Sequence, residues 1–357
     1  MTTIACLRIA NVPMLFGDLL VSSSRPPGIE ISLPAIGTIA AAADSRREYH
    51  PVGLRQKVCV ISDRLMIAWA GTQFVAQSVI KGLRERFISA PVTWTSLDEF
   101  FREYGVYELK DVQFIGLYRD NGSVTSFGIH THNFSDPVLG QCHVGGSGAG
   151  KLLAAMDSPS AQRHIEGAVR DVDTAVTSAL TFATEFLVEE LLAGLQETHF
   201  GGGFEIGALT QNGAEKVGDV LNLFWTYDST QGKNPLLMPV MIKWDYIGED
   251  LIVQRLRQER NGQGVYELPE HVISVITAPD REPGSRRPIP PDLNCRYLCN
   301  CYFSFVDHDT VRRTSSVYHA AGKSGPVRFE DSGGELHLTF DLRHFEREWE
   351  FVRNALG

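Results

Sequence analysis

The chain has 357 residues, of which 43% are hydrophobic, and a formal net charge of −10 at pH 7. This length and composition predict a globular protein with two domains, or one large domain with an appendage. The acidic balance and the absence of Lys/Arg runs argue against a nucleic-acid partner, because nucleic-acid-binding proteins usually present a basic patch.

The sequence also argues against a membrane protein and against a small secreted protein held by disulfides. No apolar run reaches the roughly 18 residues that a membrane span needs, and Arg8 and Pro13 interrupt the N-terminal segment where a signal peptide needs an unbroken apolar block. We therefore expect a cytoplasmic protein without membrane contact. Six cysteines in a chain of this length do not form a disulfide framework, so we expect free thiols.

Two groups of cysteine and histidine residues are candidate metal sites. Cys295, Cys299 and Cys301 lie near His308 in the sequence, but the spacing is not the paired C-x-x-C of a zinc site. Cys299 and Cys301 share one face of a predicted strand. His130 and His132 also alternate on a strand face, without a third ligand nearby. We interpret both groups as structural and expect neither a metal nor another cofactor.

In chain order, the first 23 residues predict a hairpin of short strands, followed by a loop or insertion at about residues 23–50. Strands at 56–62 and 64–71 precede a helix at 72–87. Ser96 and Glu99 form the pattern of a capping box for a short helix that ends at Tyr104. Asn121 and Gly122 mark the turn of a hairpin at 111–130.

The stretch "HVGGSGAGKLL", residues 143–153, follows the hairpin and has the spacing of a phosphate loop. Such a loop needs Ser or Thr after Lys151 to hold magnesium, and the chain has Leu152 there. Two helices follow, the second at about 173–195, and three glycines then lead into another strand. From residue 230 the sequence predicts mostly strands, and a proline-rich segment lies at 279–294.

This order of strands and helix pairs predicts an α+β fold in which two sheets lie between helix layers, a four-layer αββα sandwich with a strand-rich C-terminal extension. We expect a first domain at residues 1–228 and an extension of unknown role at 229–357.

Thr2 is the first residue with a distinctive chemistry. It follows Met1, and its small side chain permits removal of that methionine, which would leave a hydroxyl and a free α-amine on one residue. The reference pKa of an α-amine is about 7.7–8.0, so the amine is suited to act as a general base. A threonine paired with its own amine is an established form of activated nucleophile.

At this point the sequence resembles the family of proteasome β-subunits and the related peptidase subunit of a bacterial two-component protease, which are N-terminal nucleophile hydrolases. Its opening "TTIACLRIANVPMLFGD" is similar to theirs, and Asp18 lies sixteen residues after Thr2, as the family aspartate does. Lys57 matches the family lysine, and Gly71 follows it by fourteen residues, where the family has its oxyanion glycine. The resemblance covers about residues 2–228.

The resemblance implies roles for further residues. Ser147, in the glycine-rich turn, corresponds to the serine near the nucleophile, so the turn is not expected to bind phosphate. Ser22 and Trp69 correspond to positions that contact substrate, and Trp69 stands at the base of the main specificity pocket. A tryptophan there predicts a shallow pocket for small side chains; the alternative is an ordinary core aromatic.

The resemblance also implies a peptide or other amide substrate, a homo-oligomer and an ATPase unfoldase as a partner. Three features depart from the family: the insertion at 23–50, the tail at 229–357, and Glu197 with Phe200 where many active members have Asp and Ser. The main alternative function is a catalytically inactive scaffold that keeps Asp18 and Lys57 as a structural pair. A nucleotide-binding protein built on Lys151 is a third.

Overall fold

The computed structural model describes residues 2–25, 30–35, 37–39, 49–137, 139–156, 172–193, 200–228, 236–260, 266–282, 295–307, 310–319, 327–332 and 335–340, with single residues 343, 346, 347, 350 and 354. Met1, Glu197, His308, much of the predicted insertion and most of the proline-rich segment lie outside this part. The chain divides into two compact units. The first comprises residues 1–217, 247–251 and 275–286; the second comprises 218–246, 252–274 and 287–357.

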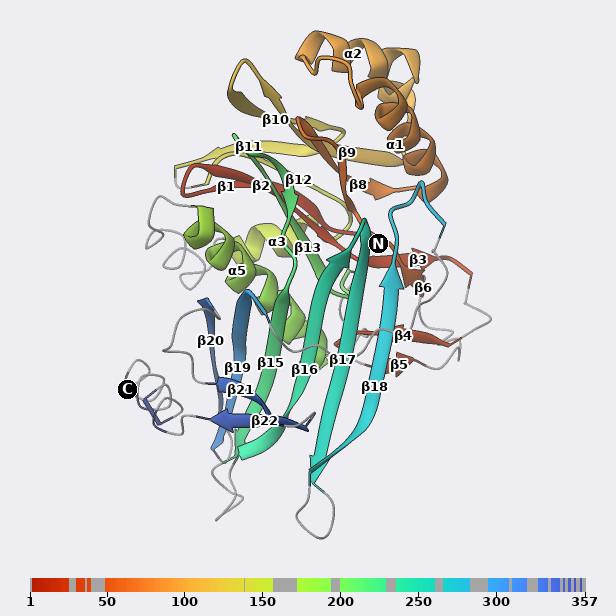
Figure 1. The fold of residues 1–357 in the computed structure, drawn as a ribbon. Coiled ribbons are helices and arrows are strands. Elements are labelled where there is room, and N and C mark those ends of the chain that lie inside the picture. The colour runs from red at the N-terminus through yellow and green to blue at the C-terminus, as the bar shows by residue number, and fades with distance from the viewer. Residues whose placement is uncertain are drawn as a thin grey trace. The chain divides into compact units, whose positions relative to one another are not determined.

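The first unit contains two larger antiparallel sheets (Figure 1). The six-stranded sheet has the order β11 (His132–Asp136), β12 (Gly140–Gly145), β1 (Ile4–Ile9), β2 (Val12–Asp18), β13 (Phe204–Thr210) and β14 (Gly213–Lys216). The four-stranded sheet has the order β10 (Ser123–Ile129), β9 (Val112–Asp120), β8 (Leu65–Gly71) and β7 (Val58–Ser62). Two short pairs join β3 (Leu20–Ser23) with β6 (His50–Leu54), and β4 (Ile31–Leu33) with β5 (Gly37–Ile39).

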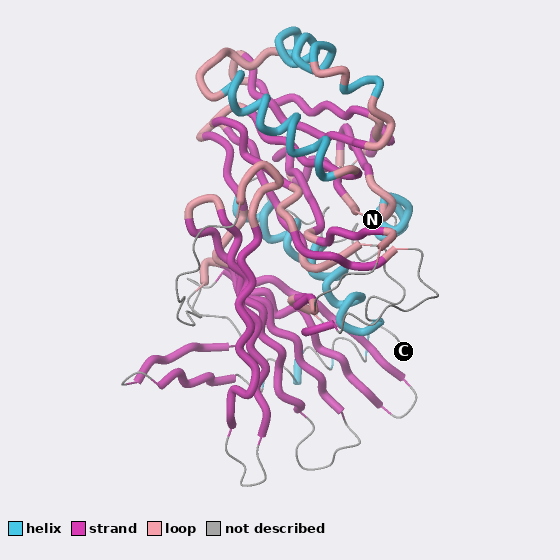
Figure 2. Tube along the Cα trace, turned by 90° about the vertical axis from the view of Figure 1, so that its right-hand side faces the viewer, coloured by secondary structure: helices cyan, strands magenta, loops and turns pink. Residues whose placement is uncertain are grey.

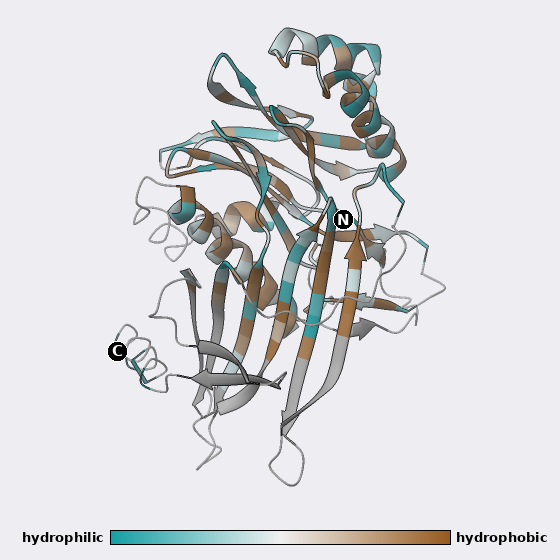
Figure 3. Cartoon of the chain, in the orientation of Figure 1, coloured by the Kyte–Doolittle hydropathy of each residue, from teal (hydrophilic) through white to brown (hydrophobic). Residues whose placement is uncertain are grey.

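Helices contact both of these sheets. The helices of this unit are α1 (Gln73–Phe87), α2 (Trp94–Glu103), the short 3-10 helix η1 (Val106–Glu108), α3 (Ala149–Met156) and α5 (Val172–Ala193). Helix α1 contacts β7 and β8, whereas α5 contacts β13 and β1. In Figure 3, α1 and α2 carry hydrophobic and hydrophilic residues in alternation, as expected for helices that bury one face.

Strand β8 shows why this unit is well packed. Six consecutive residues, 65–70, are buried, because both faces of the strand are covered. Leu65, Ile67 and Trp69 join a core cluster with α1 and α2, and the alternate residues join a second cluster that includes Ile4 and Leu15 of the six-stranded sheet. The core therefore consists of two clusters, one on each face of the four-stranded sheet.

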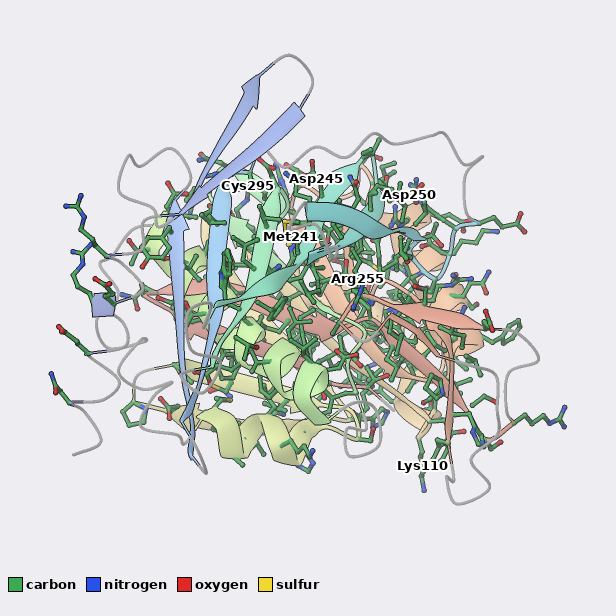
Figure 4. All side chains as sticks on the ribbon, turned by 90° about the horizontal axis from the view of Figure 1, so that it is seen from below. Lys110, Met241, Asp245, Asp250, Arg255 and Cys295 are labelled. Atoms are coloured by element: carbon green, nitrogen blue, oxygen red, sulfur yellow. The ribbon has the colours of Figure 1, made fainter. Side chains whose placement is uncertain are left out.

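The second unit is built on a further six-stranded sheet. Its order is β18 (Tyr266–Ile276), β17 (Asp250–Arg260), β16 (Leu236–Ile247), β15 (Val220–Asp228), β19 (Tyr297–Asp307) and β20 (Thr310–His319), with β15 and β19 parallel. A separate pair joins β21 (Val327–Ser332) and β22 (Glu335–Phe340). Met241 and Arg255, labelled in Figure 4, are buried on β16 and β17, and Asp245 accepts hydrogen bonds from the backbone amides of Asp219 and Tyr246.

The prediction of a four-layer αββα sandwich of the N-terminal nucleophile hydrolase type is wrong. The described part of the chain is mostly β, with 22 strands in several antiparallel sheets and four α-helices; Figure 2 shows the predominance of strand. Periodicity predicts single elements, but it determines neither how many sheets they form nor how the sheets stack.

Of three local predictions, two are confirmed and one is corrected. The N-terminal hairpin and the turn at Asn121 and Gly122 are confirmed, and both turn residues have positive φ angles. The capping box of α2 is one turn earlier than predicted: Thr93 is the N-cap and Ser96 is its partner. No helix in the described residues is long and apolar enough to span a membrane.

Candidate active site

The first hairpin brings the start of the chain beside Asp18. Strands β1 and β2 pair with Ile4 opposite Gly17, so Thr3 and Asp18 are neighbours at the open end of the hairpin. The Thr3 amide donates to Asp18 Oδ1 at 3.0 Å, and the Asp18 amide donates to the Thr3 carbonyl at 3.0 Å. These bonds, together with the strand register, fix the position of Asp18 relative to Thr3, the residue after Thr2.

The glycine-rich turn between β12 and α3 holds Thr2 from the other side. The Thr2 nitrogen donates to Ser147 Oγ at 3.1 Å, and the Gly148 amide donates to the Thr2 carbonyl at 3.1 Å. Gly146 has a φ of +87°, and a Cβ there would lie 1.9 Å from the Thr2 oxygen, so this approach requires glycine. A turn with the spacing of a phosphate loop therefore contacts the backbone of Thr2.

Asp18 is fully buried and is held by a second glycine segment. Its Oδ2 accepts a hydrogen bond from the Gly201 amide at 3.0 Å. Glu190 of α5 is 1% exposed, and both of its carboxylate oxygens accept from the Gly202 amide, at 2.9 and 3.0 Å. Residues 201–203 thus connect two buried carboxyl groups, one on β2 and one on α5.

Lys57 precedes β7 and is 1% exposed. Its amide donates to Glu205 Oε2 at 2.6 Å, and its Nζ lies 3.9 Å from the centroid of the Trp69 ring. Within the described residues no ion pair joins Lys57 to Asp18, although their charges influence each other. A Cβ at Gly17 would lie 2.7 Å from Lys57 Cβ, so the lysine packs directly on the backbone of β2.

Burial moves the pKa values of three of these groups closer to pH 7. Burial raises the pKa of Asp18 to about 6, although the charge of Lys57 and hydrogen bonds from Gly201 and Thr3 oppose the shift. Burial lowers the pKa of Lys57 to about 8, opposed by the charges of Asp18 and Glu205. Burial also raises the pKa of Glu190 to about 7. Buried groups with such shifts are candidates for a functional site.

The remaining predicted residues lie as follows. Trp69 is fully buried within the core cluster of α1 and α2. Gly71 lies at the exposed end of β8 with a φ of +100°, and a Cβ there would lie 2.0 Å from the Asp111 carbonyl oxygen. Ser22 is half-buried on β3, opposite Pro51 of β6. The structure therefore places Thr2 against Ser147, Asp18 against Thr3, and Lys57 against Trp69. The catalytic roles of these residues, the oxyanion role of Gly71 and the substrate role of Ser22 stay predictions.

Sequence reasoning missed three buried polar residues beside this group: Gln56, Glu190 and Glu205. Glu190 had a detectable signal, because it continues the helical spacing of the buried residues Ala183 and Phe186 with a charged side chain. Phe200 is buried against Phe186 and Phe204.

The two groups considered as metal sites are also placed. His130 lies between β10 and β11 rather than on a strand with His132, and its Nε2 is 3.1 Å from the Val106 carbonyl oxygen. Cys299 is buried on β19, and the side chain of Cys301 lies outside the described part.

A comparison with protein-family models finds no match for this chain, and a comparison with curated proteins finds no significantly similar relative.

Proposed function

We propose that the chain is an N-terminal threonine amidohydrolase, which cleaves peptide or other amide bonds after the bond between Met1 and Thr2 has been cut. The observation that carries the proposal is the hydrogen bond from the Thr2 nitrogen to Ser147 Oγ, 145 residues away in the sequence. Once the preceding bond is cut, this nitrogen becomes the α-amine of the nucleophile, already beside a hydroxyl group.

The reaction follows from the atoms at this position. Thr2 Oγ attacks the substrate carbonyl carbon and its proton passes to the Thr2 amine, which forms a tetrahedral oxyanion. Collapse breaks the amide bond, the departing amine takes the proton, and an ester remains on Thr2. Water then attacks this ester, and the Thr2 amine again takes the proton. The bond from the acyl carbon to Thr2 Oγ breaks, the proton returns to Oγ, and the acid is released. The Gly71 amide is our proposed donor to the oxyanion.

Lys57 and Asp18 would support the amine electrostatically. A nearby ammonium favours the neutral amine and the deprotonated hydroxyl, so it lowers both pKa values. Asp18 stabilises the charge of Lys57 and, through the Thr3 amide, also orients the residue next to the nucleophile. The proposal depends on these contacts and not on the arrangement of layers.

Hydrolysis of a panel of reporter peptides tests the proposal. We expect Thr2→Ala to abolish cleavage, because the variant lacks the hydroxyl that attacks the substrate. Thr125→Ala is the matched control, since Thr125 is exposed on β10 and should leave the rate unchanged. Full activity of Thr2→Ala would disprove the proposal, and inactivity of the parent, with Thr2 free, would favour the scaffold alternative.

A further inference from the structure

The Lys57 ammonium and the Trp69 indole form a contact that the proposed reaction does not yet explain. The Nζ atom lies 3.9 Å from the ring centroid, and neither side chain has more than 1% of its surface exposed. The two residues are also joined through the backbone, because the Trp69 amide donates to the Lys57 carbonyl at 3.1 Å. An ammonium over an indole face is stabilised electrostatically, and more strongly when water is excluded.

The indole is fixed in its orientation. Its Nε1 donates to the Gln56 carbonyl at 3.0 Å, and the ring belongs to the core cluster of α1 and α2. Gln56 is itself held, because its side-chain amide donates to the carbonyls of Glu249 and Ile276, at 2.7 and 2.6 Å. The π face is therefore presented to Lys57 by a rigid support.

Two carboxyl groups act on the Lys57 ammonium, and each of them also accepts hydrogen bonds from other groups. Asp18 on β2 and Glu205 on β13 act on it as opposite charges, and Arg55 and Cys59 are the titratable groups that act on it from its own segment. Glu205 uses Oε1 for the Lys216 ammonium at 2.7 Å and Oε2 for the Lys57 amide at 2.6 Å. Asp18 uses one carboxylate oxygen for the Thr3 amide and the other for the Gly201 amide.

We propose that Trp69 is a positioning residue that holds the Lys57 ammonium, through its indole face, in the charged form and in place beside Asp18. The inference rests on the proposed function for its catalytic consequence, but the contact itself is a property of the folded chain. It gives Trp69 a role different from that of a pocket wall.

The experiment measures the pKa of Lys57 by NMR in full-length protein with isotope-labelled lysine, with the Lys57 signal assigned from its loss in Lys57→Arg. Trp69→Leu keeps an apolar side chain but removes the π face, so we expect the pKa of Lys57 to fall by roughly one unit. Trp69→Phe retains a weaker π face and should give a smaller fall. Trp225→Leu, at a buried tryptophan of β15 in the second unit, is the control and should give no change.

The outcomes separate this inference from the proposed function. A fall in the pKa of Lys57 that is larger in Trp69→Leu than in Trp69→Phe supports the contact. If the parent shows no hydrolysis at the same time, the result counts against the proposed enzyme. An unchanged or raised pKa in Trp69→Leu overturns the inference even if the parent is active. If the parent is active, Trp69→Phe should lower the pH at which kcat declines on the alkaline side and leave KM unchanged. If the pH profile does not move but the preference between Ala- and Leu-ended peptides shifts, Trp69 is a wall of the substrate pocket and the inference is wrong.

Discussion

Two groups of buried or half-buried polar side chains adjoin Lys57, and they differ in how completely their charges are paired. In the first, which we call the supporting group, Lys216 Nζ contacts Glu205 Oε1 at 2.7 Å and Gln56 Oε1 at 2.6 Å. In the second, the candidate site, Asp18 and Lys57 are buried without a direct ion pair in the described part of the chain, and their pKa values are shifted. Close pairing is typical of a structural role, whereas shifted and incompletely paired charges are typical of a functional one.

The largest expected effect concerns Asp18 and Lys57. We predict that Asp18→Asn and Lys57→Met each lower kcat/KM by about 100-fold or more, because each removes a charge that prepares the nucleophile. The double variant should lose little more than the worse single variant, since the two residues act as a unit. Steady-state kinetics on folded protein measure this, and strict additivity of the two losses would contradict it.

In the supporting group we predict a stability effect instead. Lys216→Met leaves the Glu205 carboxylate buried without its close cationic partner, so the free energy of unfolding should fall by about 3 kcal/mol. The rate of hydrolysis per folded molecule should stay within a few-fold of the parent. Chemical denaturation and kinetics on the same sample check both parts. A 100-fold loss of rate at unchanged stability would contradict a purely structural role for the supporting group.

A smaller effect is expected at Glu190. Its pKa is raised to about 7 when folded, so the folded state binds its proton more tightly than the unfolded state does. This contribution to stability is present below the unfolded pKa and is lost as the pH rises through about 7. We predict that Glu190→Gln, which keeps an acceptor for the Gly202 amide, reduces the loss of stability between pH 5 and 8 by roughly 2 kcal/mol.

Denaturation curves at several pH values measure this difference. Glu85→Gln on the exposed face of α1 is the matched control and should leave the pH dependence unchanged. An identical pH dependence in Glu190→Gln and the parent would show that Glu190 is not titrating in this range.

The sequence predicted the local elements around the site better than their assembly. Two short apolar runs parted by Asn11 and Pro13 located the first hairpin, and the apolar run "LMIAWAG" located β8, because these signals depend on neighbouring residues. The layer arrangement was wrong, since it depends on contacts between segments far apart in the chain.

The same distinction applies within the candidate site. Thr2 was a candidate from its own chemistry, and Asp18 and Lys57 became candidates through the family resemblance. The register of β1 with β2 follows from a short hairpin. The bonds from the glycine segment to Asp18 and Glu190 join residues 183 and 12 positions apart, and no local pattern predicts them. The contact of the Lys57 ammonium with the Trp69 indole joins residues 12 positions apart on different strands or their ends, and no local pattern predicts it.

The central claim is that Thr2 acts with a free amine and its own hydroxyl. It is tested most directly by treating the purified protein with an electrophile that bonds both groups of one threonine, followed by peptide mapping with mass spectrometry. We predict a peptide that begins at Thr2 and carries one adduct spanning its nitrogen and Oγ, with hydrolysis lost in proportion to labelling. A protein that is fully active with residues still attached before Thr2, or an adduct confined to a cysteine, would contradict the claim.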